Sequence, residues 1–223
     1  MLFNTLDFVI FFIVVLTTLV IIKKRRFQHL FLLAASYFFF YYSSNYLLTL
    51  LIFTTIWDFY FGKMIFAAST IQRKKILLIA SLAGNLGLLG FFKYADFAIT
   101  QFNILGNYFD LGTSIPLLHL ALPIAISFYT FHSITYTVGI YRGQLNPTKT
   151  FVEYAIFVAF FPQLVAGPIL RAKEFLPQLI EKIENVSNSR LRLILLDQVN
   201  LKVGVTMMAI GFLKKMFFAD NIA

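Results

Sequence analysis

Residues 160–171 read FFPQLVAGPILR, a stretch that is too polar and too rich in proline for a plain membrane-spanning helix. It holds Pro162, Gln163, Gly167, Pro168 and Arg171, directly after a strongly apolar run. Proline lacks a backbone N–H, and its ring clashes with the preceding helical turn, so a helix has to break here. In hydrocarbon, the released backbone groups require protein or a water-filled cavity around them. The stretch therefore predicts a place where the membrane part of the protein is opened.

The rest of the chain has the composition of a membrane protein. Of its 223 residues, 59% are hydrophobic and 13% are charged, and phenylalanine alone supplies 28. A soluble domain of this length cannot bury so much apolar surface, so several bilayer crossings are expected. There is no cysteine, which excludes disulfides, thiolate catalysis and cysteine-ligated metals. The three histidines are dispersed, and no metal site is expected.

The net charge of +9 arises from short clusters of cations between the apolar runs. These clusters are residues 23–26, residues 73–75, Arg190 with Arg192, and Lys214 with Lys215. Such clusters are typical of cytoplasmic loops under the positive-inside rule. A nucleic-acid site would instead show a basic stripe with interleaved aromatic residues on a polar background. The lipid bilayer is therefore the expected partner, and no nucleic acid is expected.

Apolar length and loop charge together predict one transmembrane domain over residues 1–223. The predicted spans cover about residues 6–22, 27–42, 46–61, 76–92 and 116–140. Residues 93–115 are expected to form an outer loop with a short interfacial helix. Because a basic cluster ends the first span, the N-terminus is predicted to lie outside the cytoplasm.

Residues 151–170 do not fit a single crossing. Arg142 and Lys149 precede this segment, and Arg171 and Lys173 follow it. Since cations mark the cytoplasmic side, both ends of the segment are expected to lie there. A re-entrant hairpin, broken in the proline-containing stretch, meets this requirement.

The segments after the hairpin complete the predicted architecture. Residues 172–196 combine apolar residues at helical spacing with charged neighbours, which is typical of amphipathic helices at a membrane surface. Residues 199–218 are predicted to form a further membrane segment. The expected fold class is all-α: a polytopic transmembrane helical protein with a re-entrant hairpin and amphipathic surface helices.

Three blocks of the sequence resemble the membrane-bound O-acyltransferases, in that family's order. LPIAISFYTFHSITYTVGIYRG covers residues 122–143, FFPQLVAGPILR covers residues 160–171 and GFLKKMFFADNIA covers residues 211–223. The blocks are most similar to the bacterial branch that includes the alginate O-acetyltransferases. In this family, an acyl group on a cytoplasmic donor reaches its acceptor through a tunnel in the membrane, where a helix-borne histidine acts.

The resemblance implies a function as well as a fold. It implies transfer of an acyl group, here acetyl, to hydroxyls of an extracytoplasmic polysaccharide, by a multi-pass protein of the bacterial inner membrane. The implied donor is acetyl-CoA or an acyl carrier on the cytoplasmic side, and a periplasmic acetyltransferase is an implied partner. No resident cofactor is expected.

The resemblance also leaves enzymatic activity open. The family's histidine is expected beyond residue 223, so the chain resembles the N-terminal portion of such an enzyme. The alternatives are a catalytically inactive remnant or a scaffold subunit. A transporter is less favoured, because transporters typically carry paired broken segments in two related halves, and the sequence shows no such repeat.

His132 is the one histidine expected in the middle of a span, where an ionisable side chain is a candidate functional residue. It could act as a general base, line a substrate tunnel, or serve as a neutral imidazole hydrogen-bonded between helices. Asp58, inside the third predicted span, must be protonated, paired or facing water. Its expected partner is Lys63 or a residue beyond the present sequence.

The remaining candidates are residues that could bind the acyl donor or the substrate. Arg171 is expected at the cytoplasmic mouth of the hairpin, either binding a donor phosphate or acidic carrier or anchoring the membrane boundary. Gln163 is expected to bond substrate or to cap backbone released by Pro162. Gly167 and Pro168 are expected to provide the sharp turn. Arg142, in the block at residues 122–143, is grouped with them by the resemblance.

Overall fold

The computed structural model describes residues 5–22, 24–109, 112, 114–120, 125–164, 167, 171–185, 198–214 and 217. These residues form helices and connecting loops, with no strand among them, so the all-α class is confirmed. The chain divides into two compact units. The first is formed by Met1–Ala35 together with Pro177–Ala223, and the second by Ser36–Leu176. Helices α3 (Leu48–Ala67) and α4 (Ile71–Tyr108) are both long and apolar enough to cross a membrane.

The first unit contains α1 (Leu6–Ile21), the beginning of α2 (Arg25–Ser44), most of α8 (Ala172–Asn185) and α10 (Gln198–Leu213). The hydroxyl of Thr5 caps α1 by accepting from the backbone N–H of Phe8 at 3.3 Å. The turn from α1 to α2 is closed by the side-chain amide of Gln28. This amide donates to the carbonyls of Leu19 at 3.1 Å and Ile22 at 2.8 Å.

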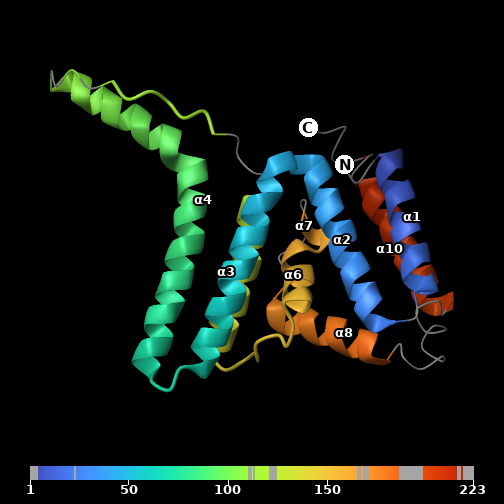
Figure 1. Cartoon of the computed structure of the whole chain (residues 1–223). Helices are drawn as coiled ribbons and strands as arrows, with labels where there is room; N and C mark the ends of the chain where they lie inside the picture. Colours follow the sequence, from blue (N-terminus) through green and yellow to red (C-terminus); the bar gives the residue numbers. More distant parts are fainter. Residues whose placement is uncertain are drawn as a thin grey trace. The chain divides into compact units, whose positions relative to one another are not determined.

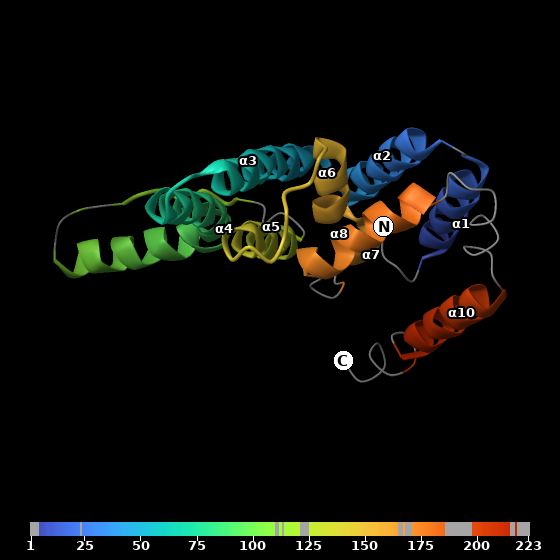
Figure 2. The same ribbon diagram turned by 90° about the horizontal axis from the view of Figure 1, so that it is seen from below.

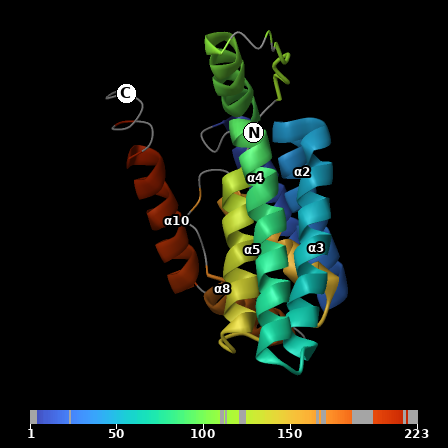
Figure 3. The same ribbon diagram turned by 90° about the vertical axis from the view of Figure 1, so that its left-hand side faces the viewer.

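The second unit is built on α3, α4 and α5 (Ile126–Tyr141), which pack side by side (Figures 1 and 3). Viewed from below (Figure 2), α4 and α6 (Phe151–Ala159) lie on opposite sides of the α3–α5 pair. The unit also contains the short helices η1 (Asn45–Leu47) and α7 (Phe161–Leu164).

Aromatic side chains fill the space between α3, α5 and α6. Tyr136 and Tyr154 are fully buried, with ring centroids 4.2 Å apart. Gly62 of α3 allows this packing, because a Cβ added there would lie 2.6 Å from the ring of Tyr136. The core of the unit therefore lies around the first turns of α6, next to the stretch in which the helix breaks.

Helix α4 corrects the expectation of an outer loop over residues 93–115. The helix does not end near residue 92 but continues without interruption to Tyr108. The polar residues that favoured a loop serve instead as partners for the chain that follows. The Asn103 amide donates to the Ile115 carbonyl at 2.8 Å and accepts from the Ile115 N–H at 2.9 Å, and Asp96 accepts from the Leu118 N–H at 2.8 Å.

Helix α5 begins ten residues later than expected, at Ile126 instead of Pro116. Residues 114–120 have no regular secondary structure, since the side chains of α4 bind their backbone groups. Ala125 precedes α5 in a left-handed conformation, with φ of 66°. The predicted start at Pro116 is therefore wrong.

Candidate functional site

The helix formed by the residues before Pro162 breaks at Phe160. Helix α6 begins with a capping box, in which the Thr150 hydroxyl accepts from the Glu153 N–H and the Glu153 carboxylate accepts from the Thr150 N–H. Phe160 then leaves the helical conformation, with φ of −56° and ψ of 109°. Pro162 explains the break, because it has no N–H to donate to the carbonyl of Val158, four residues earlier.

Gln163 and Gly167 form a tight turn after the break. The backbone N–H of Gly167 donates to the Gln163 carbonyl at 3.2 Å. A Cβ on Gly167 would collide with the backbone of Gln163, at 2.6 Å from its carbonyl oxygen, so the close approach requires glycine. The Gln163 side chain is 7% exposed, and its Oε1 has no hydrogen-bond partner among the described residues. Pro168 lies outside the described residues.

Arg171 lies directly before α8 and points its charge into solvent. Its side chain is 67% exposed and lies 3.9 Å from the carboxylate of Glu174. Its carbonyl accepts the first backbone bonds of α8, from Glu174 at 2.9 Å and Phe175 at 3.2 Å. The N-terminal end of a helix carries partial positive charge and attracts anions. Arg171 and the exposed Lys173 add two cationic side chains at this end of α8.

The chain returns to α6 as α8 begins. The ring of Phe175 lies 5.7 Å from that of Phe157 and 5.1 Å from that of Phe160. Ala172 and Leu176, one turn apart on the same helix, are almost completely buried. The first turns of α8 are therefore packed against the broken helix.

Arg142 follows the C-terminal end of α5 and is exposed. Its backbone N–H donates to the Val138 carbonyl at 3.0 Å, and Gly143 then reverses the chain with φ of 68°. A cation at a helix C-terminus interacts favourably with the helix dipole. Stabilisation of α5 is thus sufficient to explain Arg142 without a ligand.

His132 lies on α5, facing α6, and is 1% exposed. Its ring is 5.4 Å from the ring of Phe157. The imidazole lies beside the carbonyl of Val158, which receives no hydrogen bond from Pro162 because proline has no N–H. Neither ring nitrogen completes a hydrogen bond with a described residue. His132 is therefore next to the break in the helix.

A buried polar cluster that was not predicted joins α3 to α4. Asp58 is fully buried, and its Oδ1 accepts from the Ser81 hydroxyl at 2.7 Å and from Asn85 Nδ2 at 2.8 Å. Asn85 Nδ2 also donates to Asp58 Oδ2 at 2.8 Å. The expected pair with Lys63 is wrong, because Lys63 Nζ lies over the ring of Phe59, 4.3 Å from its centroid. The spacing of Ser81 and Asn85, four residues apart in an apolar run, was the available signal.

The cluster is continued towards α6 by Ser133 and Tyr154. Ser133 of α5 is a neighbour of the Asp58 carboxylate, and its hydroxyl oxygen accepts from the Tyr154 hydroxyl at 3.2 Å. Helices α3, α4, α5 and α6 are thus connected through buried polar side chains. Within the described part of the chain, no group of three metal-ligating side chains is found.

Comparison with known proteins decides the family. Over 170 residues, which are 76% of this chain, it is 36% identical to the "Probable alginate O-acetylase AlgI" of Pseudomonas putida and, separately, to that of Pseudomonas aeruginosa. The resemblance to the alginate O-acetylase-like acyltransferases is confirmed. The "Peptidoglycan O-acetyltransferase" of Helicobacter pylori is 37% identical over 175 residues, covering 67% of this chain.

The chain spans about a third of the length of these acetyltransferases: 32% of the P. putida protein and 30% of the other two. No family model matches the chain. No solved structure matches it either.

The structure brings some of the predicted site residues together. Pro162, Gln163 and Gly167 form one turn, and His132 lies beside the helix that this turn ends. Arg171 begins the helix that packs against the same element, whereas Arg142 lies at the end of α5. Ser81, Asn85, Ser133 and Tyr154 are the buried polar residues that sequence reasoning missed.

Proposed function

We propose that this chain is part of a membrane-bound O-acetyltransferase that acetylates hydroxyls of an extracytoplasmic polysaccharide. The observation that carries the proposal is the 36% identity to the alginate O-acetylases over a region covering 76% of the chain. The relatives are named for acetylation of two different polysaccharides, alginate and peptidoglycan. The shared chemistry is ester formation on a sugar hydroxyl.

The acetyl group is supplied from the cytoplasm, by acetyl-CoA or an acyl carrier. In the transfer, the acceptor hydroxyl attacks the acetyl carbonyl, the bond to the donor sulfur breaks, and the hydroxyl proton passes to a base. Both donors carry phosphate. The exposed guanidinium of Arg171 is suited to a phosphate, which it can bind with two parallel hydrogen bonds.

The residues around α6 and α7 form a re-entrant hairpin that opens to the cytoplasm. Three observations support this assignment: the helix breaks at Phe160, the rings of Phe157 and Phe160 meet Phe175 after the turn, and exposed cations flank the segment. In Figure 1, α8 also begins at the end of the second unit from which α6 starts. Arg171 then lies at the donor entrance, and Gln163 and Gly167 lie at the tip of the hairpin.

The protein belongs in this proposal to the bacterial inner membrane, with its N-terminus outside the cytoplasm. α3 and α4 supply two of the spans by length and composition. A periplasmic acetyltransferase is the partner that passes the acetyl group on to the polysaccharide.

Deletion of the gene tests the function, and variants of Arg171 test the donor site. Deletion should remove ester-linked acetate from the extracytoplasmic polysaccharide, measured as acetate released by mild base per unit of sugar. Complementation with the full-length gene should restore it. Unchanged acetate after deletion would contradict the function and favour a remnant or scaffold.

In the complemented strain, Arg171→Ala should lower acetylation strongly, and Arg171→Lys should retain part of it. The matched control is Lys173→Ala, which removes a neighbouring exposed cation of α8. Equal losses for both positions would indicate a general membrane anchor. No loss at Arg171 would contradict the donor site while leaving the acetyltransferase function intact.

A further inference from the structure

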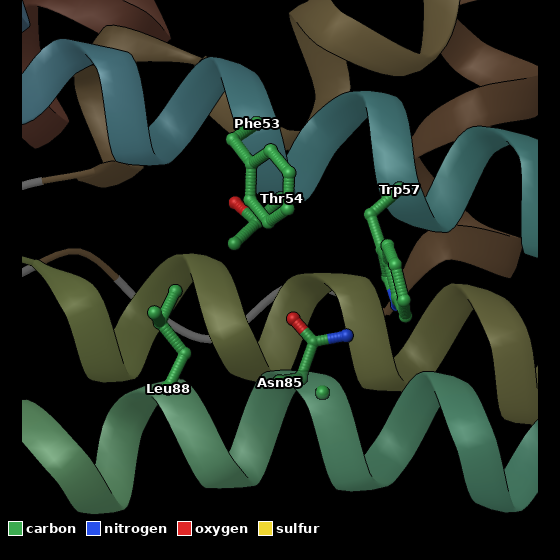
Figure 4. Close-up of a pocket in the computed structure, with 6 residues that line it drawn as sticks. Phe53, Thr54, Trp57, Asn85 and Leu88 are labelled. Carbon is green, nitrogen blue, oxygen red and sulfur yellow. The ribbon is translucent and has the colours of Figure 1, made fainter.

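The second half of helix α4 extends beyond the helices that hold the first half. In the first half, Trp57 of α3 reaches towards α4 (Figure 4) and lies over Gly84, where an added Cβ would be 3.1 Å from the indole nitrogen. After Asn85, Gly106 is the only buried residue of α4, all of which the structure describes. Figure 1 shows that α4 bends about half-way along its length and then points away from α3. Viewed from below (Figure 2), this part runs sideways, and we call residues 91–109 the arm.

One face of the arm is apolar. Residues three or four apart lie on the same face of a helix, and one such series contains only aliphatic and aromatic side chains. Its large members are between 51% and 64% exposed, the values of Phe102 and Phe109. A continuous exposed apolar surface of this kind marks contact with a partner or a membrane. The series, here called the apolar stripe, consists of Phe91, Tyr94, Ala98, Phe102, Leu105 and Phe109.

The opposite side of the arm is polar. Thr100 and Phe102 are two residues apart, which places them about 200° apart around the helix axis. A second series at helical spacing passes through Thr100, and its members that do not bind other parts of the chain's backbone are exposed. An apolar face opposite a polar one is typical of helices that lie in the surface of a membrane. This polar stripe consists of Lys93, Asp96, Thr100, Asn103 and Asn107.

The chain that returns after α4 is compatible with the same surface. Irregular backbone can approach lipid only if its hydrogen-bonding groups are satisfied by protein. Both backbone groups of Ile115 bond to the Asn103 side chain, and the N–H of Leu118 bonds to Asp96. Pro116, between them, has no N–H. The returning chain can therefore accompany the arm to the edge of the lipid.

Continuity with a membrane span favours the membrane over a protein as the partner of the apolar stripe. Helix α4 is a candidate span, and its 38 residues exceed the roughly 20 that cross the hydrocarbon of a bilayer. The arm follows the first half without a break in the helix, so it begins at the surface of the bilayer. Lys93 is the only cation of the arm, so its attraction to the membrane does not require anionic lipid.

We propose that the arm lies in the headgroup region of the outer leaflet, with the apolar stripe on the acyl chains and the polar stripe towards water. Tyr94 suits this depth, because tyrosine rings prefer the boundary between membrane and water. The bend in α4 changes the course of the helix from across the bilayer to along its surface. This inference rests on the bilayer crossing by α4 in the proposed function, but not on acetyl transfer.

Spin labels on the two stripes test the proposal, because the chain has no cysteine of its own. Thr100→Cys and Phe102→Cys replace exposed residues on opposite sides of the arm. Each variant of the intact chain carries a nitroxide in phosphatidylcholine nanodiscs. Collisions are measured with oxygen, which concentrates in lipid, and with a water-soluble nickel chelate. The ratio of oxygen to nickel collisions should be several-fold higher at Phe102 than at Thr100.

Two further labels on α4 calibrate the scale. Arg73→Cys lies at the exposed N-terminal end and should favour nickel, and Leu86→Cys, at a residue 48% exposed in the first half, should favour oxygen. If Leu86 favours nickel, the proposed crossing fails together with the arm. If Leu86 favours oxygen while Thr100 and Phe102 both favour nickel, the arm stands in water, and this inference alone fails.

The remaining outcomes also decide. Equal preference for oxygen at Thr100 and Phe102 would place the whole arm in hydrocarbon and overturn the proposal. Protection of Phe102 from both reagents would show that a second copy of the chain covers the apolar stripe, and it would overturn the proposal as well. If either variant does not fold, Leu105→Cys and Asn107→Cys form an equivalent exposed pair on the two stripes.

Discussion

At the residue scale, His132 lies beside a backbone carbonyl that receives no helical hydrogen bond, because the residue four positions later is a proline. Pro162 cannot donate to the Val158 carbonyl, and the His132 imidazole is the polar side chain beside that carbonyl. The imidazole is 1% exposed, and its ring is tilted by 42° against that of Phe157. A neutral side chain that offers an N–H to the released carbonyl fits this position, and it favours a structural role over proton transfer.

Replacement of His132 by glutamine should therefore preserve acetyl transfer, because the glutamine amide also offers an N–H to Val158. His132→Phe should change the free energy of unfolding by no more than about 1 kcal/mol, because neither ring nitrogen has a hydrogen bond to lose among the described residues. Thermal unfolding in detergent and ester-linked acetate in cells measure the two effects. Loss of transfer in His132→Gln, with unchanged stability, would instead identify an acid–base role.

Gly167 offers a second residue-scale prediction. Gly167→Ala should destabilise the protein by about 1–3 kcal/mol, because the new methyl group meets the Gln163 backbone. Gly90→Ala is the matched control, since nothing lies within 4 Å of a Cβ at that position of α4. In the middle of a helix, alanine should stabilise by about 0.5–1 kcal/mol. Equal effects at both positions would contradict the close turn.

At the element scale, α3 and α4 are joined through one buried carboxylate. A buried carboxyl group is tolerated only if it is hydrogen-bonded, and Ser81 and Asn85 supply the donors. Asn85→Ala should lower the free energy of unfolding by about 1–3 kcal/mol, the cost of leaving a buried polar group without its partner. In an Asp58→Leu background, the same change should cost much less. Additive effects in this double-mutant cycle would contradict the coupling.

The break between α6 and α7 is a property of Pro162. Pro162→Ala restores an N–H for the Val158 carbonyl, so the two helices should join and residues 160–164 should become more protected in hydrogen exchange. Acetyl transfer should fall, since the hairpin tip moves. Pro177→Ala is the control, because that proline lies inside α8 and is exposed. A variant at Pro162 with unchanged protection would show that packing, not proline, sets the break.

The elements also show what could be predicted from sequence. The break in α6 was predictable, because proline chemistry is local. The length of α4 was not, since Asp96 and Asn103 resemble loop residues until the chain returns and binds them. The same limit applies to Asp58: its donors lie 23 and 27 residues away, and only the packing of α3 on α4 brings them together.

At the scale of the whole molecule, the length of α4 has to be reconciled with a bilayer. Its 38 residues correspond to about 57 Å, roughly twice the thickness of the hydrocarbon core. If α4 crosses the bilayer, one part of it extends beyond the hydrocarbon. The part with Lys93, Asp96 and Asn103, together with the returning residues 114–120, is the polar end, and in the proposed topology it lies in the headgroup region or beyond.

The proposed topology makes a direct prediction, because the chain contains no cysteine of its own. Single cysteines at Lys149, Lys173 and Ser114 are expected to be reachable, since all three residues are exposed. If residues 151–170 enter and leave on the cytoplasmic side, a membrane-impermeant maleimide should label Lys149→Cys and Lys173→Cys in inside-out vesicles only. Ser114→Cys, which follows the C-terminal end of α4 and lies outside the cytoplasm in the proposed topology, should be labelled in intact spheroplasts only. Labelling of the two lysine positions from opposite sides would mean that the segment crosses the bilayer, and Arg171 would then not lie at a cytoplasmic entrance.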